Sequence, residues 1–464
     1  MRVPPDADAF TTGLAEIREQ FDVPGEFAPE VLAAAEDAAA REPGAEHVDR
    51  TDVEYVTLDP ASARDLDQAF AIEQRGADVV LHYAIADVGF FVQPGDALDQ
   101  EAWRRGVTVY LPDAKAPLYP PVLSEGAASL LPDADKPAVV FTVLVDEEGD
   151  VRMDGVERAV VRSRAKLAYD SVRNDELPSG FAELARRIQH AERRRDAPRV
   201  EFPEQEVERA ADGTWSLVFR PRLPSEERNA GMSLATNLAV ADALQAAGTG
   251  LFRVMAEPDE RAISRLRHTA RAFGFSWPSD QNLLEFQRTL PAGDPRSAAF
   301  LIAVRRAGGG ASYEAFDDGH RPWHAAMAAT YAHATAPLRR LADRYVVEAT
   351  LAVANGREVA KDIQAAFAEL PAAMERAEST ANRVDSAVLD LAEAVLLADR
   401  QGDVFDAVVV DEDSNHAGTA LVQLTDPAVL ARVAAHDIDP GDDVRIKVVT
   451  VDIDARRVEL QRVG

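Results

Sequence analysis

Two stretches of the chain decide its fold. The first is Thr57-Leu58-Asp59-Pro60-Ala61-Ser62-Ala63-Arg64-Asp65-Leu66-Asp67, which follows a strand-like run and carries three aspartates within nine residues. The second, much later in the chain, is His333-Ala334-Thr335-Ala336-Pro337-Leu338-Arg339-Arg340. One stretch concentrates carboxylates at a junction between strand and loop, and the other places two arginines after a proline.

The three aspartates of the first stretch predict a site for a hard cation. If the loop folds back, Asp59, Asp65 and Asp67 bring like charges together, which is unfavourable unless a cation lies between them. Mg²⁺ prefers oxygen ligands and is often held by a few carboxylates together with water and substrate phosphate. The simpler alternative is an acidic surface loop, in a chain with 80 acidic residues. Spacing alone favours that alternative.

The second stretch predicts a phosphate contact. Pro337 suits the first position of a helix, which would place Arg339 and Arg340 in the first turn, where the helix dipole disfavours cations. An anion at that point would resolve the conflict, because free backbone N–H groups and arginine would converge on it. The alternative is that the arginines pair with a nearby acid such as Asp343 or Asp317. Taken alone, that alternative is the better one.

Together the two stretches supply what metal-assisted phosphodiester hydrolysis needs, namely carboxylates for a cation and a donor for phosphate oxygens. They therefore favour a nuclease. The formal net charge of −30 does not exclude this function, because bulk charge affects solubility whereas local charge makes a site. We interpret the charge as a solubilising surface.

Composition limits the other classes of function. The chain has 464 residues, enough for two or three domains, and 47% of them are hydrophobic. It has no cysteine, which rules out disulfide partners and thiolate metal sites. We see no signal peptide and no apolar run long enough to span a bilayer. We therefore expect a cytoplasmic protein with no membrane partner.

Hydrophobic patterning predicts an α+β chain with three parts. Residues 1–50 form a short helical segment, with helices expected over 12–20 and 28–40. Residues 51–400 form a catalytic domain in which strands precede a mainly helical region, with loops expected at 203–224 and 308–322. Residues 401–464 form a small OB-like barrel of short strands. The strands are expected at 53–58, 79–85, 138–145, 403–410, 443–453 and 456–460.

Taken together, these motifs resemble the ribonuclease II (RNB) family of 3′-to-5′ exoribonucleases. The similarity runs in order from about residue 51 to 395 and adds several further segments to the two stretches. These segments are His82–Val88, Arg105–Pro112, Leu123-Ser124-Glu125, Ser129–Pro132, Leu251–Val254 and Tyr331–Asp343.

The resemblance implies an RNB-type catalytic domain of mixed sheet and packed helices, followed by an OB-like RNA-binding barrel. It implies hydrolysis of single-stranded RNA from the 3′ end to nucleoside 5′-monophosphates, with Mg²⁺ as cofactor and Mn²⁺ as its alternative. Asp59, Asp65 and Asp67 would be catalytic and hold the metal. Arg339 would also be catalytic, touching the scissile phosphate.

The RNA contacts expected from the resemblance and the sequence are Tyr110, Arg339, Arg340 and Arg164. Tyr110 would stack on a base near the 3′ end, or else serve as a core aromatic; its sequence context supports both roles equally. Arg164 lies in a strand-like segment of alternating basic residues, which could line one wall of a channel.

Three departures from the family pattern affect function. Gln68 stands where the family usually has a fourth aspartate; its amide oxygen can ligate a metal but brings no charge. Asn382 stands near the place where a glutamate is expected. Only about 50 residues precede the metal segment, too few for the cold-shock barrels of many relatives, so we expect weaker or less processive RNA binding, or different access to structured RNA ends. The alternative functions are therefore a catalytically impaired RNA-binding protein with the RNB fold and a phosphodiesterase for short oligonucleotides.

Overall fold

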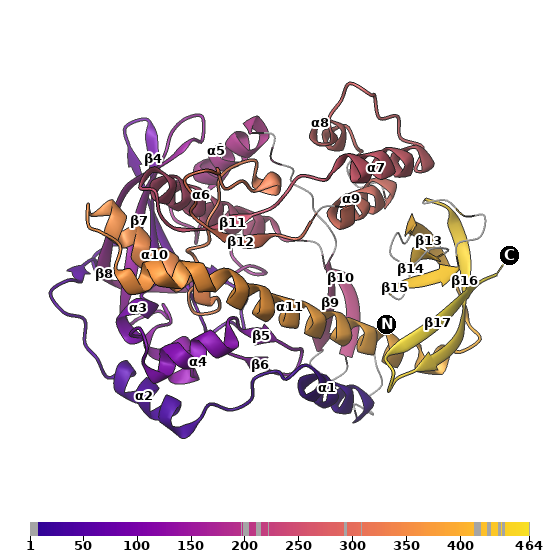
Figure 1. The fold of residues 1–464 in the computed structure, drawn as a ribbon, viewed down its shortest axis with the longest axis horizontal. Helices are drawn as coiled ribbons and strands as arrows, with labels where there is room; N and C mark the ends of the chain where they lie inside the picture. The colour runs from indigo at the N-terminus through magenta and orange to yellow at the C-terminus, as the bar shows by residue number, and fades with distance from the viewer. Residues whose placement is uncertain are drawn as a thin grey trace.

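The computed structural model describes residues 8–195, 197, 204–209, 215–220, 222–291, 295–307, 309–412, 419–424, 428–434, 438 and 441–463. A sheet covered by helices fills one end of the molecule, and a small all-β unit lies at the other end (Figure 1). The predicted α+β class is confirmed.

The large sheet is mixed and closes on itself. Its six strands are ordered β1-β8-β2-β3-β4-β7, and β7 pairs again with β8. Strand β8 makes this closure possible because its residues 151–162 pair with β7 and its residues 163–168 pair with β2. The strands are β1 (Val48–Asp49), β2 (Tyr55–Asp59), β3 (Gln68–Arg75), β4 (Asp78–Ala86), β7 (Asp135–Val145) and β8 (Val151–Ala168).

The closed sheet determines where the aspartates lie. Strand β2 runs parallel to β8 and ends at Asp59, which pairs with Ala168. Strand β3 begins at Gln68, paired with Ile85, and runs antiparallel to β4. The loop between β2 and β3 therefore carries Asp65 and Asp67 at one edge of the sheet. Two short strands follow later in the chain, β5 (Val109–Tyr110) and β6 (Lys115–Ala116).

Helices and small two-stranded sheets surround the large sheet. The helices before residue 300 are α1 (Asp8–Gln20), α2 (Pro29–Ala39), α3 (Val88–Phe91), α4 (Ala97–Arg105), η1 (Leu123–Ala127), α5 (Phe181–Arg194), α6 (Pro224–Ala246), α7 (Glu260–Ala272), α8 (Leu283–Arg288) and α9 (Pro295–Ala307). Those that follow are η2 (Ala325–Met327), α10 (Leu341–Ala354), α11 (Lys361–Leu397) and η3 (Ala398–Arg400). Strands β9 (Glu204–Arg209) and β10 (Trp215–Arg220) form a hairpin. Strands β11 (Leu251–Val254) and β12 (Ser312–Ala315) form a two-stranded antiparallel sheet, with α7, α8 and α9 between them in the chain.

Helix α11 connects the two ends of the molecule. It has 37 residues and crosses from the helices that cover the large sheet to the terminal strands (Figure 1). Near its end the buried carboxylate of Glu393 accepts hydrogen bonds from Gln205 Nε2 at 2.9 Å and from Leu430 N at 3.0 Å. The helix is therefore tied to hairpin β9–β10 and to the terminal unit at one point.

The terminal unit is a five-stranded antiparallel sheet, ordered β15-β14-β13-β16-β17 and nearly closed into a barrel. Its strands are β13 (Val404–Glu412), β14 (Thr419–Leu424), β15 (Leu430–Ala434), β16 (Asp443–Asp452) and β17 (Arg457–Arg462). Irregular pairing between Val409 and Asp411 and between Val448 and Thr450 bends the two longest strands. This confirms the OB-like barrel.

Three local predictions are wrong. The expected loop at 203–224 contains hairpin β9–β10, and the expected loop at 308–322 contains β12. The helix expected to start at Pro337 begins only at Leu341. Within the described ranges, no helix combines the length and apolar character needed to cross a bilayer.

Candidate functional site

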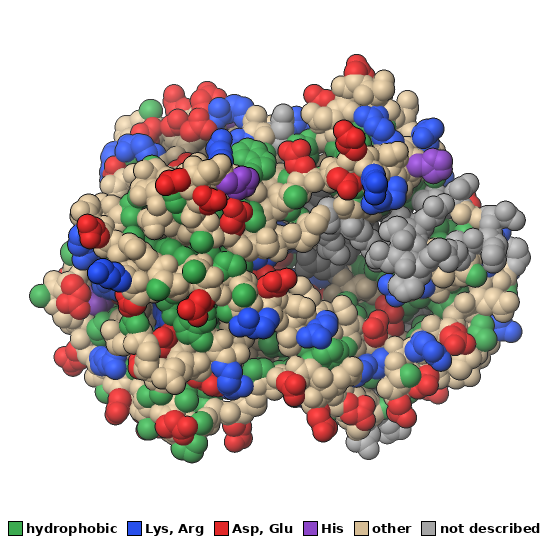
Figure 2. All heavy atoms as spheres, in the orientation of Figure 1, with side chains coloured by type: hydrophobic (Ala, Val, Ile, Leu, Met, Phe, Trp, Pro, Cys, Tyr) green, Lys and Arg blue, Asp and Glu red, His purple; other side chains and the backbone are tan. Residues whose placement is uncertain are grey.

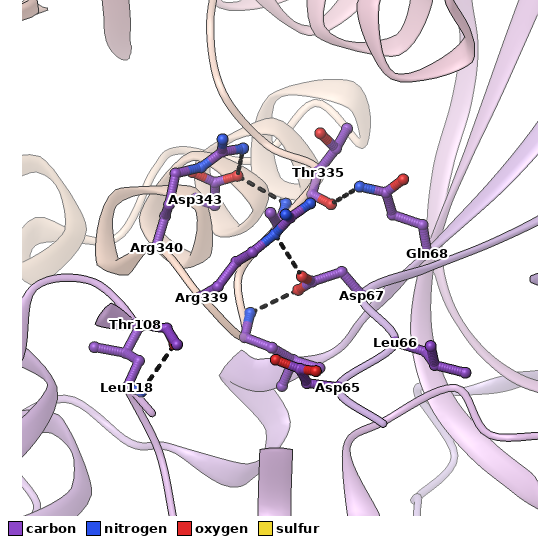
Figure 3. A network of polar contacts seen from close by, with 12 residues as sticks. Asp65, Leu66, Asp67, Gln68, Thr108, Leu118, Thr335, Arg339, Arg340 and Asp343 are labelled. Atoms are coloured by element: carbon purple, nitrogen blue, oxygen red, sulfur yellow. Dashed lines mark hydrogen bonds and ion pairs between the residues drawn. The ribbon is translucent and has the colours of Figure 1, made fainter. Parts of the chain in front are cut away.

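Asp67 and Arg339 meet at the centre of the site (Figure 3). Arg339 Nε lies 3.1 Å from Asp67 Oδ2, and Asp67 Oδ1 accepts a hydrogen bond of 2.7 Å from Leu338 N. Asp67 is buried, whereas the Arg339 side chain is 46% exposed. One carboxylate therefore holds both the backbone and the side chain of the arginine stretch, and the guanidinium remains accessible from outside.

The chain from Ala334 to Arg340, hereafter the arginine segment, is a turn and not the start of a helix. Arg340 is extended, with φ −133° and ψ 123°, and occupies the N-cap position of α10. Arg340 Nε and Nη2 donate to Asp343 at 2.9 and 2.7 Å, and Asp343 also accepts from Ala336 N at 2.8 Å. The N–H groups of Arg339 and Arg340 turn back to the Ala336 carbonyl, at 3.2 and 3.0 Å, but the extended Arg340 ends this turn before α10 begins, so the predicted helix start at Pro337 was wrong.

The ion pair with Asp343 also determines where the Arg340 side chain lies. Its bidentate contact with Asp343 is the alternative foreseen from the sequence, and its side chain is only 25% exposed. Arg339 points away from that pair and toward Asp67 (Figure 3). The two neighbouring arginines therefore differ: Arg340 is held by a carboxylate on its own helix, and Arg339 bridges to the aspartate loop.

Asp59 and Asp65 provide the remaining carboxylates. Asp65 lies 3.0 Å from Lys115 Nζ and accepts a 3.3 Å hydrogen bond from the Tyr110 hydroxyl. The carboxylate of Asp59 has no hydrogen bond or ion pair within the described part of the chain. Burial raises its pKa to about 6, and the charge of nearby Asp65 adds to this effect although Arg339 opposes it.

The pKa of the buried Asp67 carboxyl group is also shifted from its ordinary value. Burial raises its pKa to about 7, although Arg339 and the Leu338 N–H both stabilise the charged form. Two carboxyl groups whose charged forms are disfavoured thus lie at the end of β2 and the start of β3. Perturbed carboxyl groups that gather in this way are typical of functional sites.

Tyr110 is not a core aromatic. It lies on β5 with 48% of its surface exposed, and its hydroxyl reaches Asp65. Beside it is a pocket of about 330 Å³. The residues that line this pocket include Thr108, Tyr110, Arg253, Arg339, Glu378 and Asn382. The structure therefore gathers an accessible aromatic ring and an accessible guanidinium around one opening.

The side chains of Gln68 and Arg164 both donate hydrogen bonds to backbone carbonyl groups. The Gln68 side chain is turned toward Thr335 (Figure 3), and its Nε2 donates to the Thr335 carbonyl at 2.6 Å. Arg164, on β8, is exposed and donates to the carbonyl of Thr51. Two residues further along β8, Lys166 Nζ donates to Ala61 O at 2.7 Å and so supports the loop that follows Asp59.

The sequence analysis did not predict that Arg253 and Glu378 line the pocket beside Tyr110. Arg253 Nη1 lies 2.9 Å from Glu378 Oε2, and its guanidinium lies 4.5 Å from the centre of the Tyr313 ring. Glu378 is one helical turn before Asn382 on α11, and both line the pocket. Glu378 therefore brings a carboxylate to the pocket one turn from Asn382, the position near which the resemblance leads one to expect a glutamate.

The carboxylates fit a hard cation that takes few protein ligands. The described residues contain no group of three or more His, Cys, Asp or Glu placed to hold a metal ion. Asp59 nevertheless has a carboxylate without a protein partner, and its charge and that of Asp65 repel each other. Mg²⁺ keeps several waters and uses one or two carboxylates plus phosphate oxygens, which this pair can provide.

The face of the molecule shown in Figure 2 carries no single basic surface. On the face shown in Figure 2, acidic and basic side chains are interspersed. This distribution agrees with the interpretation of the net charge as a solubilising surface. At the pocket itself, Arg339 and Arg253 bring positive charge to the lining.

Similarity to known proteins identifies two domains in the chain. Residues 47–355 match the RNB domain, and residues 403–463 match the RNase II-type exonuclease C-terminal S1 domain. Ribonuclease R of Thermotoga maritima is 28% identical over 85% of this chain and 59% of its own length. Ribonuclease R of Aquifex aeolicus is 26% identical over 87% of this chain and 63% of its own length. The chain thus spans only about six tenths of these relatives.

Solved structures show the same fold. Mycoplasma genitalium RNase R in complex with ribose-methylated single-stranded RNA matches with a TM-score of 0.87, 18% identity, and coverage of 98% of this chain and 78% of that one. Yeast Ssd1, a pseudonuclease, matches with a TM-score of 0.65, 17% identity, and coverage of 90% and 54%. The resemblance seen in the sequence is confirmed: a domain match over most of the chain, followed in order by a matching terminal domain, shows that this chain belongs to the RNB family.

Proposed function

We propose that this chain is a Mg²⁺-dependent hydrolytic exoribonuclease that degrades single-stranded RNA from the 3′ end to nucleoside 5′-monophosphates. The observation that carries the proposal is the contact between buried Asp67 and half-exposed Arg339 beside a pocket with an exposed tyrosine. RNase R relatives and an RNase R structure that contains single-stranded RNA support the choice of substrate.

We propose a separate task for each side chain. Asp59 and Asp65 would hold the cation, and Asp67 keeps Arg339 oriented toward the opening. Arg339 can donate to a non-bridging phosphate oxygen and stabilise charge in the transition state. When bound, the divalent ion supplies Lewis-acid chemistry, which activates water and stabilises the leaving oxygen.

Tyr110 would contribute binding rather than chemistry. Half of its surface is available for a base, and stacking of this kind contributes about 1–3 kcal/mol per base. Its hydroxyl donates to Asp65, which fixes the position of the ring relative to the carboxylates. A stacked terminal base would hold its phosphate near Arg339. The absence of cysteine agrees with a reducing compartment, and we propose action in the cytoplasm.

A second candidate is an RNA-binding protein that keeps the fold without catalysis. The observation that favours it is Gln68, which brings an uncharged amide to a position where the family usually has an aspartate. A pseudonuclease shares this fold, so the fold is compatible with loss of activity. The two candidates differ in one measurable property, the release of nucleotides.

Incubation of the purified chain with 5′-labelled single-stranded RNA tests both candidates. The substrates are a long and a short RNA, each with Mg²⁺, Mn²⁺ or a chelator, beside Asp67→Asn and the exposed control Arg104→Ala. A ladder that shortens from the 3′ end, requires metal, persists in the control and disappears in Asp67→Asn supports the exoribonuclease. Intact RNA that remains bound supports the second candidate, and cleavage of the short RNA alone indicates an oligonucleotide phosphodiesterase.

A further inference from the structure

Gln68 joins the aspartate loop to the arginine segment. Its Nε2 donates to the Thr335 carbonyl at 2.6 Å, and its Oε1 accepts from the Tyr83 hydroxyl. The orientation of the amide is fixed because a backbone carbonyl can only accept, so the nitrogen must face Thr335. Gln68 is adjacent to Asp67, which holds Leu338 and Arg339 of the same segment.

The arginine segment is held from several directions by side chains. Helix α6 contributes Asn237, whose Oδ1 accepts from Ala334 N at 2.9 Å, and Ser233, whose hydroxyl lies 2.6 Å from Thr335 Oγ1. Asp343 accepts from Ala336 N at 2.8 Å. These three contacts involve N–H groups or a hydroxyl of the arginine segment, and none of them involves one of its carbonyl groups. Among the described residues, only Gln68 donates to the Thr335 carbonyl.

We propose that Gln68 is a positioning residue that fastens the arginine segment to the sheet, and that it does not serve as a substitute metal ligand. An aspartate at this position cannot perform the task, because it is shorter and its ionised carboxylate donates no hydrogen bond. The amide at position 68 and the carboxylate at position 67 thus hold the segment in two different ways. Gln68 fixes the carbonyl of Thr335, and Asp67 fixes the N–H of Leu338.

This role explains why the amide does not face the aspartates. Turning the amide oxygen toward a cation would break its hydrogen bond with the Tyr83 hydroxyl and move Nε2 away from the Thr335 carbonyl, for which the described residues offer no other donor. A buried polar group without a partner is unfavourable, so the observed orientation is the stable one. Gln68→Asp, which restores the aspartate usual in the family, should therefore weaken the attachment of the arginine segment and lower the cleavage rate.

The test compares Gln68→Asp and Gln68→Ala with wild type in three measurements. These are hydrogen exchange of a peptide covering residues 333–341, RNA affinity in chelator, and the Mg²⁺ concentration that gives the half-maximal cleavage rate. We expect faster exchange of the peptide in both variants and a rate loss of about tenfold in Gln68→Asp. We expect no fall in the Mg²⁺ concentration required.

The matched control is Gln100→Glu. Gln100 is exposed and also donates to a backbone carbonyl, that of Gly95 at 2.9 Å, but it lies outside the site. This variant should leave exchange of the 333–341 peptide and the cleavage rate unchanged. If the Gln68 variants do not fold, Tyr83→Phe replaces them, because it removes only the hydroxyl that orients the amide. It should give the same change in exchange with a smaller amplitude.

Two results would overturn the proposal. One is a Gln68→Asp protein that cleaves faster or requires less Mg²⁺ than wild type while its peptide exchange is unchanged, since Gln68 would then act as a weakened ligand. The other is unchanged exchange in every variant, Tyr83→Phe included. The cleavage measurement rests on the proposed function, but the exchange measurement does not. A chain without nuclease activity therefore still tests the fastening role.

Discussion

The carboxylate of Asp67 contacts Arg339 through one oxygen and the N–H of Leu338 through the other, at 3.1 and 2.7 Å. The guanidinium is therefore held in place before any substrate arrives. Pre-placed donors act at the moment when charge develops on a phosphate, without reorganisation. On the proposed function, the contribution of Arg339 to catalysis would therefore depend on Asp67 as much as on its own charge.

Replacement of Arg339 should damage catalysis more than binding. We expect Arg339→Ala to lower kcat by roughly a hundred- to a thousandfold. Arg339→Lys should recover only part of this, because an ammonium cannot reproduce the planar fork of donors. Single-turnover cleavage of labelled RNA measures the effect. Arg104→Ala, which removes an exposed ion pair with Glu101, is the control and should keep the wild-type rate. Equal losses in the two alanine variants would contradict the assignment.

Tyr110 should act through its ring. We expect Tyr110→Ala to weaken RNA binding by about 1–3 kcal/mol. Tyr110→Phe keeps the ring and loses only the hydrogen bond to Asp65, so it should bind nearly as tightly as wild type. Fluorescence anisotropy with single-stranded RNA in chelator measures both. A phenylalanine variant as weak as the alanine variant would show that the hydroxyl, not stacking, is responsible.

Removal of divalent metal should separate cleavage from binding. A chelator should stop nucleotide release while RNA remains bound, because Tyr110, Arg253 and Arg339 do not depend on the ion. We expect Asp59→Asn to raise the Mg²⁺ concentration for half-maximal rate by about tenfold or more. Asp154→Asn, at an exposed ion pair with Arg75, serves as control. Cleavage at full rate in chelator would exclude the metal from the reaction.

The buried carboxyl of Glu393 should make the joint between α11 and the barrel sensitive to pH. Burial raises its pKa to about 7 from an ordinary value of 4.5. Between these values the folded state binds more protons than the unfolded state, so the free energy of unfolding falls as pH rises through that window. Glu393→Gln keeps the acceptor oxygen for Gln205 and Leu430 and removes the charge.

We therefore expect Glu393→Gln to be more stable than wild type at pH 8, by on the order of 2 kcal/mol. The difference should vanish well below pH 4.5, where the Glu393 carboxyl of wild type is protonated in both the folded and the unfolded state. Thermal unfolding across this pH range measures it. Glu369→Gln changes an exposed residue of the same helix and should show no such trend. A constant difference at all pH values would mean that the ionisation of Glu393 is not involved.

Gly106 should be intolerant of any side chain. Its φ of +70° is left-handed, and an added Cβ would lie 2.4 Å from the Cβ of Ala377 on α11. Gly76 has a similar φ of +65° but open space around it, so Gly76→Ala measures the backbone cost alone, about 1–2 kcal/mol. Urea unfolding should show a clearly larger loss for Gly106→Ala. Equal losses would mean that α11 moves aside freely.

Elements with strong local patterns could be predicted from the sequence. The runs at 53–58, 79–85 and 138–145 became β2, β4 and β7 because their apolar residues are buried in the sheet. The order of motifs also identified the family. The arginine stretch was placed in a helix because Pro337 suits a helix start, and no local rule could show that Asp67 would take the N–H of Leu338.

The site could be predicted only in part, because its contacts join residues that are far apart in the sequence. Residue types at Asp59, Asp65, Asp67 and Arg339 suggested their chemistry, and the structure brings Asp67 and Arg339 into contact. The direction of the Gln68 amide depends on Thr335, a partner 267 residues away. Such a partner is visible only after the chain has folded.

The contact between Asp67 and Leu338 also has a consequence for biosynthesis. The two residues are 271 positions apart, and contacts of such high sequence separation form late because they must close a long loop. A nascent chain that has emerged only as far as α9 holds the acidic half of the centre without its arginine. The contact between Asp67 and Arg339 can therefore form only after residues 334–340 have been made, and a chain that stops at α9 has the aspartate loop without the assembled site.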